Sequence, residues 1–526
     1  MKYRFGVWGS LLACLSLVLA ILPASPTSAL PVALLPADTA VSWEASLDGS
    51  EVLYRTNANE LRAVRVSDHA DALITASANL VLRSVLSPNG AYVAFFKTAP
   101  GGYELWLAAT DGSGSRLVLT APSDQFGGMT QAKFTPNGSH FLYTTTPTNA
   151  LKALYSVATV GNAAPVLLNP PPFMTFEIHR YIASPDSSHV VFSQIITNAN
   201  YDFVNVYSVP VDGPGSASVK LNRNGPSTVY YGELAISPDS QRVVLPDSGF
   251  YSMDLNGGNR VQLSPAGAIN ALAVSADSTR IVYGWMNGST MNGEYYVVPI
   301  NGPMSAAVQV ISVHQIEMDE VTFTADGARI VAYVRLPGAI TYSLYSTPTQ
   351  GPASAAVDLS AGLTLTSRIQ PGFEYRPTSH IAVGLGSSQL WSLPVAGPAS
   401  APQLLSPGAR DFAVTTPDGA RVVYTSNNQV YSVPIAGPLS ATRNESLSLN
   451  GGSPISAIQV AENSQRLFFS AGGAVYVTAL GTGLPVAWLQ PECQSVAPTP
   501  GPTPTTTPGL VPRLYLPAVQ RCEGVK

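Results

Sequence analysis

Polar and charged side chains recur at one position of this chain, four or five residues before the Ser or Thr that opens a tight turn. Charged residues make up only 11% of the sequence, so their recurrence at one position is informative. If these side chains lie close together in the fold, they could bind a ligand, a cation or a peptide through charge and hydrogen bonds. The alternative is a solvated loop face. The residues concerned are Gln131, His179, Arg180, Glu233, Asp319 and Glu320.

The other residue types that carry chemistry are not spaced for it. Three of the six histidines stand where other copies of the repeat carry Arg, which favours a structural role; they are His140, His189 and His380. His69, in the run Asp68-His69-Ala70-Asp71, suits hard metal ligands only loosely, and a structural role is favoured there too. There is no zinc spacing, EF-hand loop or Gly-x-Ser-x-Gly elbow. We therefore expect no metal, no cofactor and no serine hydrolase.

The turn that sets this register is clearest at Ser237-Pro238-Asp239-Ser240. Pro presets φ at the second position of a type I turn, and the Asp side chain can bond back to its own backbone. About ten copies occur, separated by 38 residues (Asp239 to Asp277) up to 53 residues (Asp186 to Asp239). Named by the residue at the Asp position, they are Asp48, Asn89, Asn137, Asp186, Asp239, Asp277, Asp326, Thr378, Asp418 and Asn463.

Each unit between turns has the pattern of four short strands. A short strand leads into the turn, a run rich in Val, Ile and aromatics follows it, and a third strand such as VYSVPV (206–211) precedes a weaker fourth. All-strand units repeated at about 45 residues are typical of propeller blades. We predict an all-β fold, a β-propeller of about ten four-stranded antiparallel blades over 30–490. One large ring is favoured, and two smaller rings are the alternative because propellers usually have four to eight blades.

Three further segments bear on this architecture. The apolar stretch Leu30 to Ala37 is expected to supply a strand that helps to close the ring. Phrases such as VPVDGPGSAS (209–218) contain Gly-Pro and predict turns at blade edges, since Pro cannot donate a ladder hydrogen bond. Loops such as 198–203 and 285–294 carry aromatics and amides that suit either recognition or capping of the core.

The N-terminus has the features of a secretory signal over residues 1–29. Lys2 and Arg4 precede an apolar run from Val7 to Leu22, and Thr27-Ser28-Ala29 resembles a cleavage site. An uncleaved anchor and lipidation at Cys14 are the alternatives. We expect an exported protein that is periplasmic, cell-surface or extracellular, with no transmembrane segment in the mature chain. The net charge of −5 and the absence of a basic run argue against binding of nucleic acid.

The C-terminal composition differs from that of the repeats. Residues 491–509 form a Pro/Thr-rich linker that cannot pack a core. Residues 510–526 form a short peptide that is either a disordered tail or a sorting or docking peptide. Export permits a disulfide between Cys493 and Cys522, with two free thiols as the alternative.

Tandem Ser-Pro-Asp-Gly-like turns, each followed by a basic residue and a β-branched run, resemble the TolB-type propeller family over about residues 40 to 490. The same repeat occurs in the propellers of prolyl-oligopeptidase-like and tricorn-type peptidases. The resemblance implies a secreted propeller that binds protein or peptide partners. TolB itself has fewer blades and an extra α/β domain, and neither feature fits this sequence.

The function that the sequence favours is a non-catalytic binding scaffold at the cell envelope or outside the cell. Its partner is expected to be a protein or peptide, with a glycan as a further candidate. One alternative is a propeller enzyme, a polysaccharide lyase or hydrolase that uses acids such as Glu233 and Glu320 at the mouth of the central channel. A purely structural envelope protein is the other.

Overall fold

The computed structural model describes residues 31–480 with short breaks. The breaks lie at 36, 38–39, 77–80, 123–130, 146–152, 171–175, 198–201, 224–233, 267–268, 288–291, 315–316, 336–342, 362, 364, 368–376, 386–388, 398–401, 407–411 and 447–453. The predicted signal peptide, linker, C-terminal peptide and cysteine pair all lie outside the described residues. The described part of the chain contains no helix with the length and apolar character that a membrane crossing requires.

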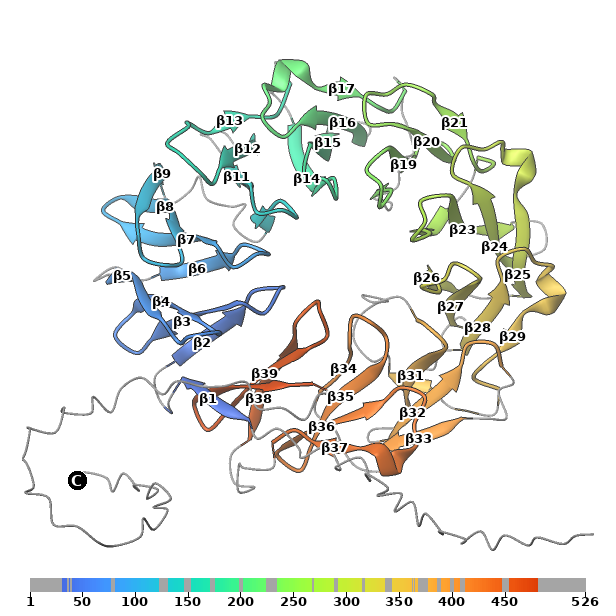
Figure 1. The fold of residues 1–526 in the computed structure, drawn as a ribbon. Helices are drawn as coiled ribbons and strands as arrows, with labels where there is room; N and C mark the ends of the chain where they lie inside the picture. Colours follow the sequence, from blue (N-terminus) through green and yellow to red (C-terminus); the bar gives the residue numbers. More distant parts are fainter. Residues whose placement is uncertain are drawn as a thin grey trace, which may run out of the picture. The chain divides into compact units, whose positions relative to one another are not determined.

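Ten four-stranded antiparallel sheets stand in one ring, so the fold is a ten-bladed β-propeller (Figure 1). The first strand of each blade borders the middle of the ring, and the fourth strand lies on its outside. The predicted fold class is confirmed, and the alternative of two smaller rings is wrong. Each blade is apolar on both faces, so it needs a neighbour on either side.

The first five blades follow the chain in order. Blade 1 is β2 (Ala40–Ala45), β3 (Glu51–Thr56), β4 (Glu60–Arg65) and β5 (Asp71–Ala76); blade 2 is β6 (Val81–Leu86), β7 (Tyr92–Ala99), β8 (Gly102–Ala109) and β9 (Ser115–Pro122); blade 3 is β10 (Lys133–Phe134), β11 (His140–Thr145), β12 (Ala153–Ala158) and β13 (Val166–Leu167); blade 4 is β14 (Phe176–Ala183), β15 (His189–Thr197), β16 (Asp202–Pro210) and β17 (Val219–Lys220); blade 5 is β18 (Ala235–Ile236), β19 (Arg242–Pro246), β20 (Phe250–Asp254) and β21 (Val261–Gln262).

The remaining blades repeat the plan. Blade 6 is β22 (Ile269–Val274), β23 (Arg280–Asn287), β24 (Asn292–Pro299) and β25 (Val308–His314); blade 7 is β26 (Glu317–Phe323), β27 (Arg329–Arg335), β28 (Ser343–Pro348) and β29 (Val357–Asp358); blade 8 is β30 (Leu365–Ser367), β31 (His380–Leu385), β32 (Gln389–Pro394) and β33 (Gln403–Ser406); blade 9 is β34 (Ala413–Thr415), β35 (Arg421–Ser426), β36 (Gln429–Pro434) and β37 (Arg443–Asn444); blade 10 is β38 (Ile455–Val460), β39 (Arg466–Ala471), β40 (Ala474–Ala479) and β1 (Val32–Leu35).

The turn between the first and second strands has the predicted geometry in nine blades; in blade 8, which has the degenerate copy at Thr378, residues 368–376 of this connection lie outside the described chain. In blade 5 the Ser240 N–H donates to the Ser237 carbonyl at 2.8 Å, which closes the type I turn. The Asp239 carboxylate accepts from the Ser237 hydroxyl at 2.5 Å and from the Gln241 N–H at 3.0 Å. The fourth turn residue is left-handed, with φ of 60° at Ser240. The polar side chains therefore hold the turn before any neighbouring blade is added.

These turns are also hydrogen-bonded from blade to blade, in blade 6 through Arg280 at the start of β23, so the bonds form a closed circle. The pairs, donor first, are Asp48 N with Pro88 O (3.3 Å), Asn89 Nδ2 with Asn137 O (3.4 Å), Asn137 N with Ser187 Oγ (3.1 Å), Asp186 N with Ser240 Oγ (2.9 Å), Asp239 N with Ser278 Oγ (3.0 Å), Arg280 Nη2 with Gly327 O (2.9 Å), Ala325 N with Pro377 O (2.8 Å), Thr378 Oγ1 with Gly419 O (3.2 Å), Asp418 N with Ser464 Oγ (2.9 Å) and Glu462 N with Leu47 O (2.7 Å).

The circle explains why the left-handed position is Gly in some blades and Ser in others. Where it is Ser, as at Ser240, the hydroxyl accepts the N–H from the preceding blade. Where it is Gly, the preceding turn comes too close for a side chain. A Cβ at Gly49 would lie 2.9 Å from the Ala461 Cβ, and one at Gly419 would lie 2.7 Å from the Thr378 Cγ2. The residue type is thus set by the neighbouring blade as well as by φ.

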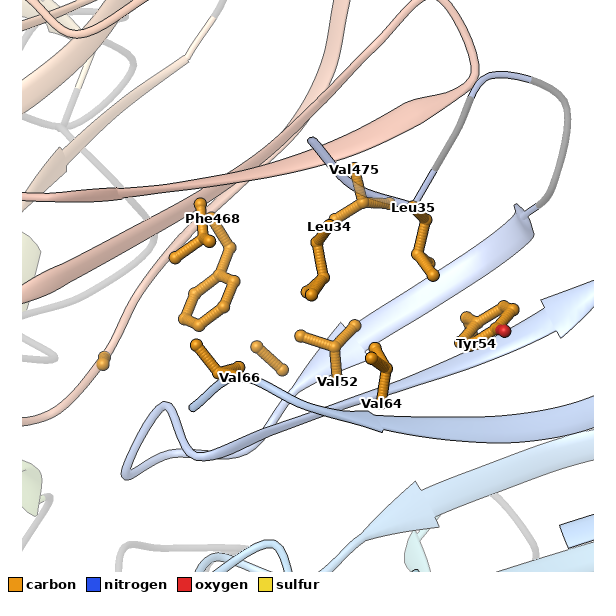
Figure 2. Close-up of a cluster of buried hydrophobic side chains, with 11 residues drawn as sticks. Leu34, Leu35, Val52, Tyr54, Val64, Val66, Phe468 and Val475 are labelled. Atoms are coloured by element: carbon orange, nitrogen blue, oxygen red, sulfur yellow. The ribbon is translucent and has the colours of Figure 1, made fainter. Parts of the chain in front are cut away.

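The core consists of ten apolar clusters, one at each boundary between blades. The cluster between blades 10 and 1 includes the N-terminal strand, as Figure 2 shows. β1 pairs antiparallel with β40 and forms the outer strand of blade 10, while Leu34 and Leu35 pack toward Val52 and Val64 of blade 1. The strand predicted to help close the ring therefore does so.

The Gly-Pro phrases lie between the third and fourth strands, at the blade edge as predicted. The short 3₁₀ helices η3 (Gly215–Ala217), η4 (Met304–Ala306), η5 (Ala353–Ala355) and η6 (Leu439–Ala441) follow them. A Cβ at Gly213 would lie 2.4 Å from the Val166 Cγ1 of blade 3, and one at Gly302 would lie 2.4 Å from the Val261 Cγ1 of blade 5. These glycines therefore allow each outer turn to close onto the preceding blade.

Exchanging Gly and Ser at the left-handed turn position is expected to have unequal effects. Gly49→Ser should lower the free energy of unfolding by about 1–3 kcal/mol, because the new Cβ meets the Ala461 Cβ at the ring closure. Ser240→Gly removes the hydroxyl that accepts a hydrogen bond from the Asp186 N–H, but it also removes the strain of a non-glycine residue at positive φ. The free energy of unfolding should therefore change by less than about 1 kcal/mol. Urea unfolding of both variants measures this difference, and equal losses would contradict it.

Truncating the closing strand should be costly. Leu34→Ala is expected to lower the free energy of unfolding by about 2–4 kcal/mol, because Leu34 is 5% exposed within the cluster that joins the two ends of the ring. Val41→Ala on the adjoining β2 is the control, since Val41 is 54% exposed and its loss should change stability by less than about 0.5 kcal/mol. Thermal and urea unfolding of the two variants would show no difference if β1 were not part of the closure.

Candidate functional site

The inner strands contain a β-bulge at a common level. In β2, Ala40 pairs with Thr56 and Ser42 with Arg55, so Val41 between them has no partner in the ladder. β6, β14, β30 and β38 each skip one residue in the same way, and β22 and β26 skip two. A bulge turns a side chain away from the regular alternation of a strand and is common next to binding sites. The skipped residues include Val41, Leu82, His179, Asp319, Glu320 and Ser456.

This bulge is the position that the sequence singled out. His179 is a bulged residue, and both His179 and Arg180 are exposed on β14. Gln131, just before β10 of blade 3, is exposed, and its Nε2 donates to the His179 carbonyl at 3.1 Å. Three predicted site residues therefore meet at the boundary between blades 3 and 4.

The other predicted residues are not part of that group. Glu320 is half-buried on β26 of blade 7, and blades 5 and 6 separate it from blade 4. The Asp319 side chain and all of Glu233 lie outside the described residues. The six residues thus follow one register but are spread around the ring, so whether they act as one site stays a prediction.

Several long polar side chains on the inner strands bridge to the backbone of the next blade. Gln459 accepts from the Ala45 N–H at 3.0 Å and donates to the Ala45 carbonyl at 2.7 Å. Lys133 donates from Nζ to the Tyr181 carbonyl at 2.8 Å. Each inner strand is paired on one side only, so these bonds satisfy backbone groups at its free edge. Gln131 belongs to this set, which gives its amide a structural role.

Lys133 lies in a cationic and partly apolar setting. Its Nζ is 5.0 Å from the centroid of the Tyr181 ring, while the Tyr181 hydroxyl donates to the carbonyl of Gln131 and, at 3.3 Å, to that of Leu142. Burial lowers the pKa of Lys133, and the nearby charge of Arg180 lowers it further. Lys133 and Arg180 stand on the inner strands of adjoining blades, β10 of blade 3 and β14 of blade 4.

Arg83 is a candidate site residue that sequence reasoning missed. It follows the bulged Leu82 on β6 of blade 2 and stands four residues before Ser87, which is the same register as Arg180. Applying that register to every repeat would have found it. Burial raises the pKa of Glu44 on β2, against the opposing effects of the Leu86 N–H and the Arg83 charge. Arg83 thus adds a third cation to the inner wall.

A cavity of about 210 Å³ lies on the same inner strands, between blades 1 and 2. Its lining includes Ser42 and Glu44 of β2, Arg55 of β3 and Ser84 of β6. Two apolar side chains stand exposed at the adjoining bulges, Leu82 at 39% and Val41 at 54%. The inner wall of blades 1 to 4 therefore offers cationic, polar and apolar groups together.

The predicted structural roles of the histidines agree with their contacts. His140, His189 and His380 each begin the second strand of a different blade, and each Nδ1 lies 2.9–3.0 Å from the hydroxyl of the preceding Ser. Next to His69, Asp68 pairs with Arg65 at 3.0 Å and Asp71 pairs with Arg62 at 3.0 Å. Among the described residues, no group of three or more His, Cys, Asp or Glu side chains is arranged to hold a metal ion.

For the loop 285–294, the sequence left open whether its aromatic side chain, Trp285, serves recognition or caps the core. Trp285 is partly buried at the end of β23, packs on the core cluster between blades 5 and 6, and lies 6.3 Å from the Tyr296 ring. Its role is therefore core packing. Residues 198–201 and 288–291 lie outside the described chain.

No protein-family model matches the chain, and no curated protein is similar to it in sequence. Many solved structures overlap with it at low identity. Porphyromonas gingivalis dipeptidyl peptidase 4 is 8% identical with a TM-score of 0.44, over 83% of this chain and 65% of that one. An oligogalacturonate lyase from Vibrio parahaemolyticus is 9% identical with a TM-score of 0.36, over 84% and 98%.

A putative TolB from Agrobacterium tumefaciens is 15% identical with a TM-score of 0.26, over 50% of this chain and 93% of that one. Overlaps at this level carry no functional argument. The propeller is shown by the ten sheets themselves, whereas membership of the TolB-type family stays a prediction from the repeat.

The carboxyl of Glu51 should make stability depend on pH. Glu51 opens β3, and burial raises its pKa to about 7 from the ordinary 4.5, although Arg65 Nε lies 3.3 Å away and opposes this. The folded state holds the proton more tightly than the unfolded state, so its contribution is full below pH 4.5 and is lost as pH rises through 7.

We expect Glu51→Gln to be more stable than the wild type at pH 8 by about 1–2 kcal/mol, after allowing for screening by water. The difference should disappear near pH 4. Urea unfolding at both pH values measures it, and Glu60→Gln on the same blade is the control for loss of one charge. A difference that stays constant with pH would show that Glu51 titrates normally.

Proposed function

We propose that this chain is an exported, non-catalytic β-propeller that binds a protein or peptide ligand on the inner wall of its ring, at the cell envelope or outside the cell. The bulges carry this proposal, because they turn side chains of several blades out of the ladder at one level. Binding groups held by a rigid scaffold lose little conformational freedom when a ligand binds. The signal-like residues 1–29 support export.

A photo-crosslinking amino acid placed at Leu82 or at Val160 tests the location of binding. Leu82 is a bulged residue on the inner strand of blade 2, and Val160, 68% exposed, follows β12 on blade 3. In producing cells we expect an adduct from position 82 and none from position 160. The chain should be found outside the cytoplasm with a mass that lacks residues 1–29. Equal adducts at both positions, or a cytoplasmic chain, would contradict the proposal.

The second candidate is an enzyme that acts on polysaccharide through acids at the channel mouth. Glu320 is the one residue of the predicted acidic pair whose side chain the structure describes, and it lies on the bulge of β26. Turnover of an acidic polysaccharide by the purified full chain, lost in Glu320→Gln, would favour the enzyme. Binding without turnover, unchanged in that variant, would favour the scaffold.

A further inference from the structure

We infer that the inner wall of blades 2 to 4 is an anion-binding surface whose ligand is an acidic, partly apolar peptide segment. This inference rests on the proposed binding function and names the class of ligand. We call Arg83, Lys133 and Arg180 the cationic arc. The three residues stand on the innermost strands of three consecutive blades: Arg83 on β6, Lys133 on β10 and Arg180 on β14. Arg83 and Arg180 each directly follow a bulged residue.

The arc is a local concentration of positive charge in a chain that carries a net charge of −5. β6 and β10 contain no acidic residue, and β14 contains one, Glu177. On blade 1, the carboxyl of Glu44 interacts electrostatically with Arg83. Three cations on adjoining blades raise the local concentration of anionic ligands more than isolated surface charges would.

The members of the arc are placed for different roles. Lys133 is bonded to the Tyr181 carbonyl, so it supplies a fixed charge behind the surface. Arg180 is exposed, and its guanidinium can present two parallel N–H donors to a carboxylate. Arg83 is half-buried and follows the bulged Leu82 on β6, as Arg180 follows the bulged His179 on β14. The charges of blades 2 and 4 therefore stand at the same level of the inner wall.

The apolar side chains beside the arc favour a peptide over an acidic glycan. Leu82 precedes Arg83 in sequence and is 39% exposed, and Val41 at the matching bulge of blade 1 is 54% exposed. A uronate polymer offers carboxylates and hydroxyls but little apolar surface. A peptide that combines Glu or Asp with Leu or Val matches both kinds of group.

Fluorescence anisotropy with the purified full chain tests the inference. The probe is a labelled peptide of alternating Glu and Leu, and its matched control carries Gln in place of every Glu. We expect the Glu peptide to bind at least about tenfold more tightly than the Gln peptide, and binding to weaken at least about fivefold between 50 and 500 mM salt. Equal affinity for the two peptides, or no binding, would overturn the inference.

Single substitutions in the cationic arc test whether the Glu peptide binds there. Arg83→Gln and Arg180→Gln should each weaken binding of the Glu peptide at least about fivefold. Arg180→Lys should weaken it less than Arg180→Gln, because Lys keeps the charge but not the two parallel donors. Lys220→Gln removes the same charge from β17, the outermost strand of blade 4, and should have no effect. Equal loss in Lys220→Gln would indicate general electrostatics and overturn the assignment. Circular dichroism and the melting temperature confirm that each variant is folded.

A labelled oligogalacturonate is the competing probe. If it bound more tightly than the Glu peptide with the same dependence on Arg180, the site would be glycan-binding and the peptide inference would be wrong. If neither probe bound while position 82 still crosslinked to a partner in cells, the binding scaffold would stand and only its anionic specificity would fall.

Discussion

The circle of hydrogen bonds between neighbouring Asp turns is the constraint on which the rest of this structure depends. Each turn is held by its own side chains and also bonds to the turn of the next blade, so adjoining sheets meet at a fixed height and spacing. The apolar clusters between blades supply most of the favourable free energy, but burial of apolar surface is not directional. Hydrogen bonds supply the direction, and the circle must close because every blade is apolar on both faces.

Closure of the ring brings its first and last strands together in one sheet. Blade 10 takes its fourth strand from β1, so its sheet joins residues that are more than 400 positions apart in sequence. Bonds from Gln459 to Ala45 and from Glu462 to Leu47 reinforce the same boundary. Forming such contacts carries a high entropic cost, because a long loop must be closed. They also complete the burial of both flanking blades.

The same frame explains why polar residues gather on the inner wall. An inner strand has a free edge, and natural proteins protect such edges with bulges and charged side chains. Here Lys133 and Gln459 bond to the backbone of the next blade, while bulges expose His179 and Leu82. The residues that protect the edge therefore adjoin the residues that we propose as binding groups. This is why a residue such as Gln131 could be selected as a ligand contact and yet also bond within the fold.

The sequence by itself determined the blade count, the type I turns, the four-stranded units and the closing strand. Each of these depends on local chemistry, such as Pro238 and Asp239 in one turn, or on the repeat of that chemistry along the chain. It also identified the register that carries His179 and Arg180, because bulge and turn are separated by a constant number of residues.

Only the tertiary structure decided that the array is one ring, and which members of the register meet. It showed that Gly49 and Ser240 differ because of the preceding blade, that Gln131 reaches the backbone at His179, and that Arg83, Lys133 and Arg180 stand on the inner strands of consecutive blades. These features arise from contacts between residues on separate sheets that are far apart in sequence, 48 positions for Gln131 and His179 and more than 400 for Gly49 and Ala461. No local pattern encodes such contacts, because the curvature of the ring sets the distance across each boundary.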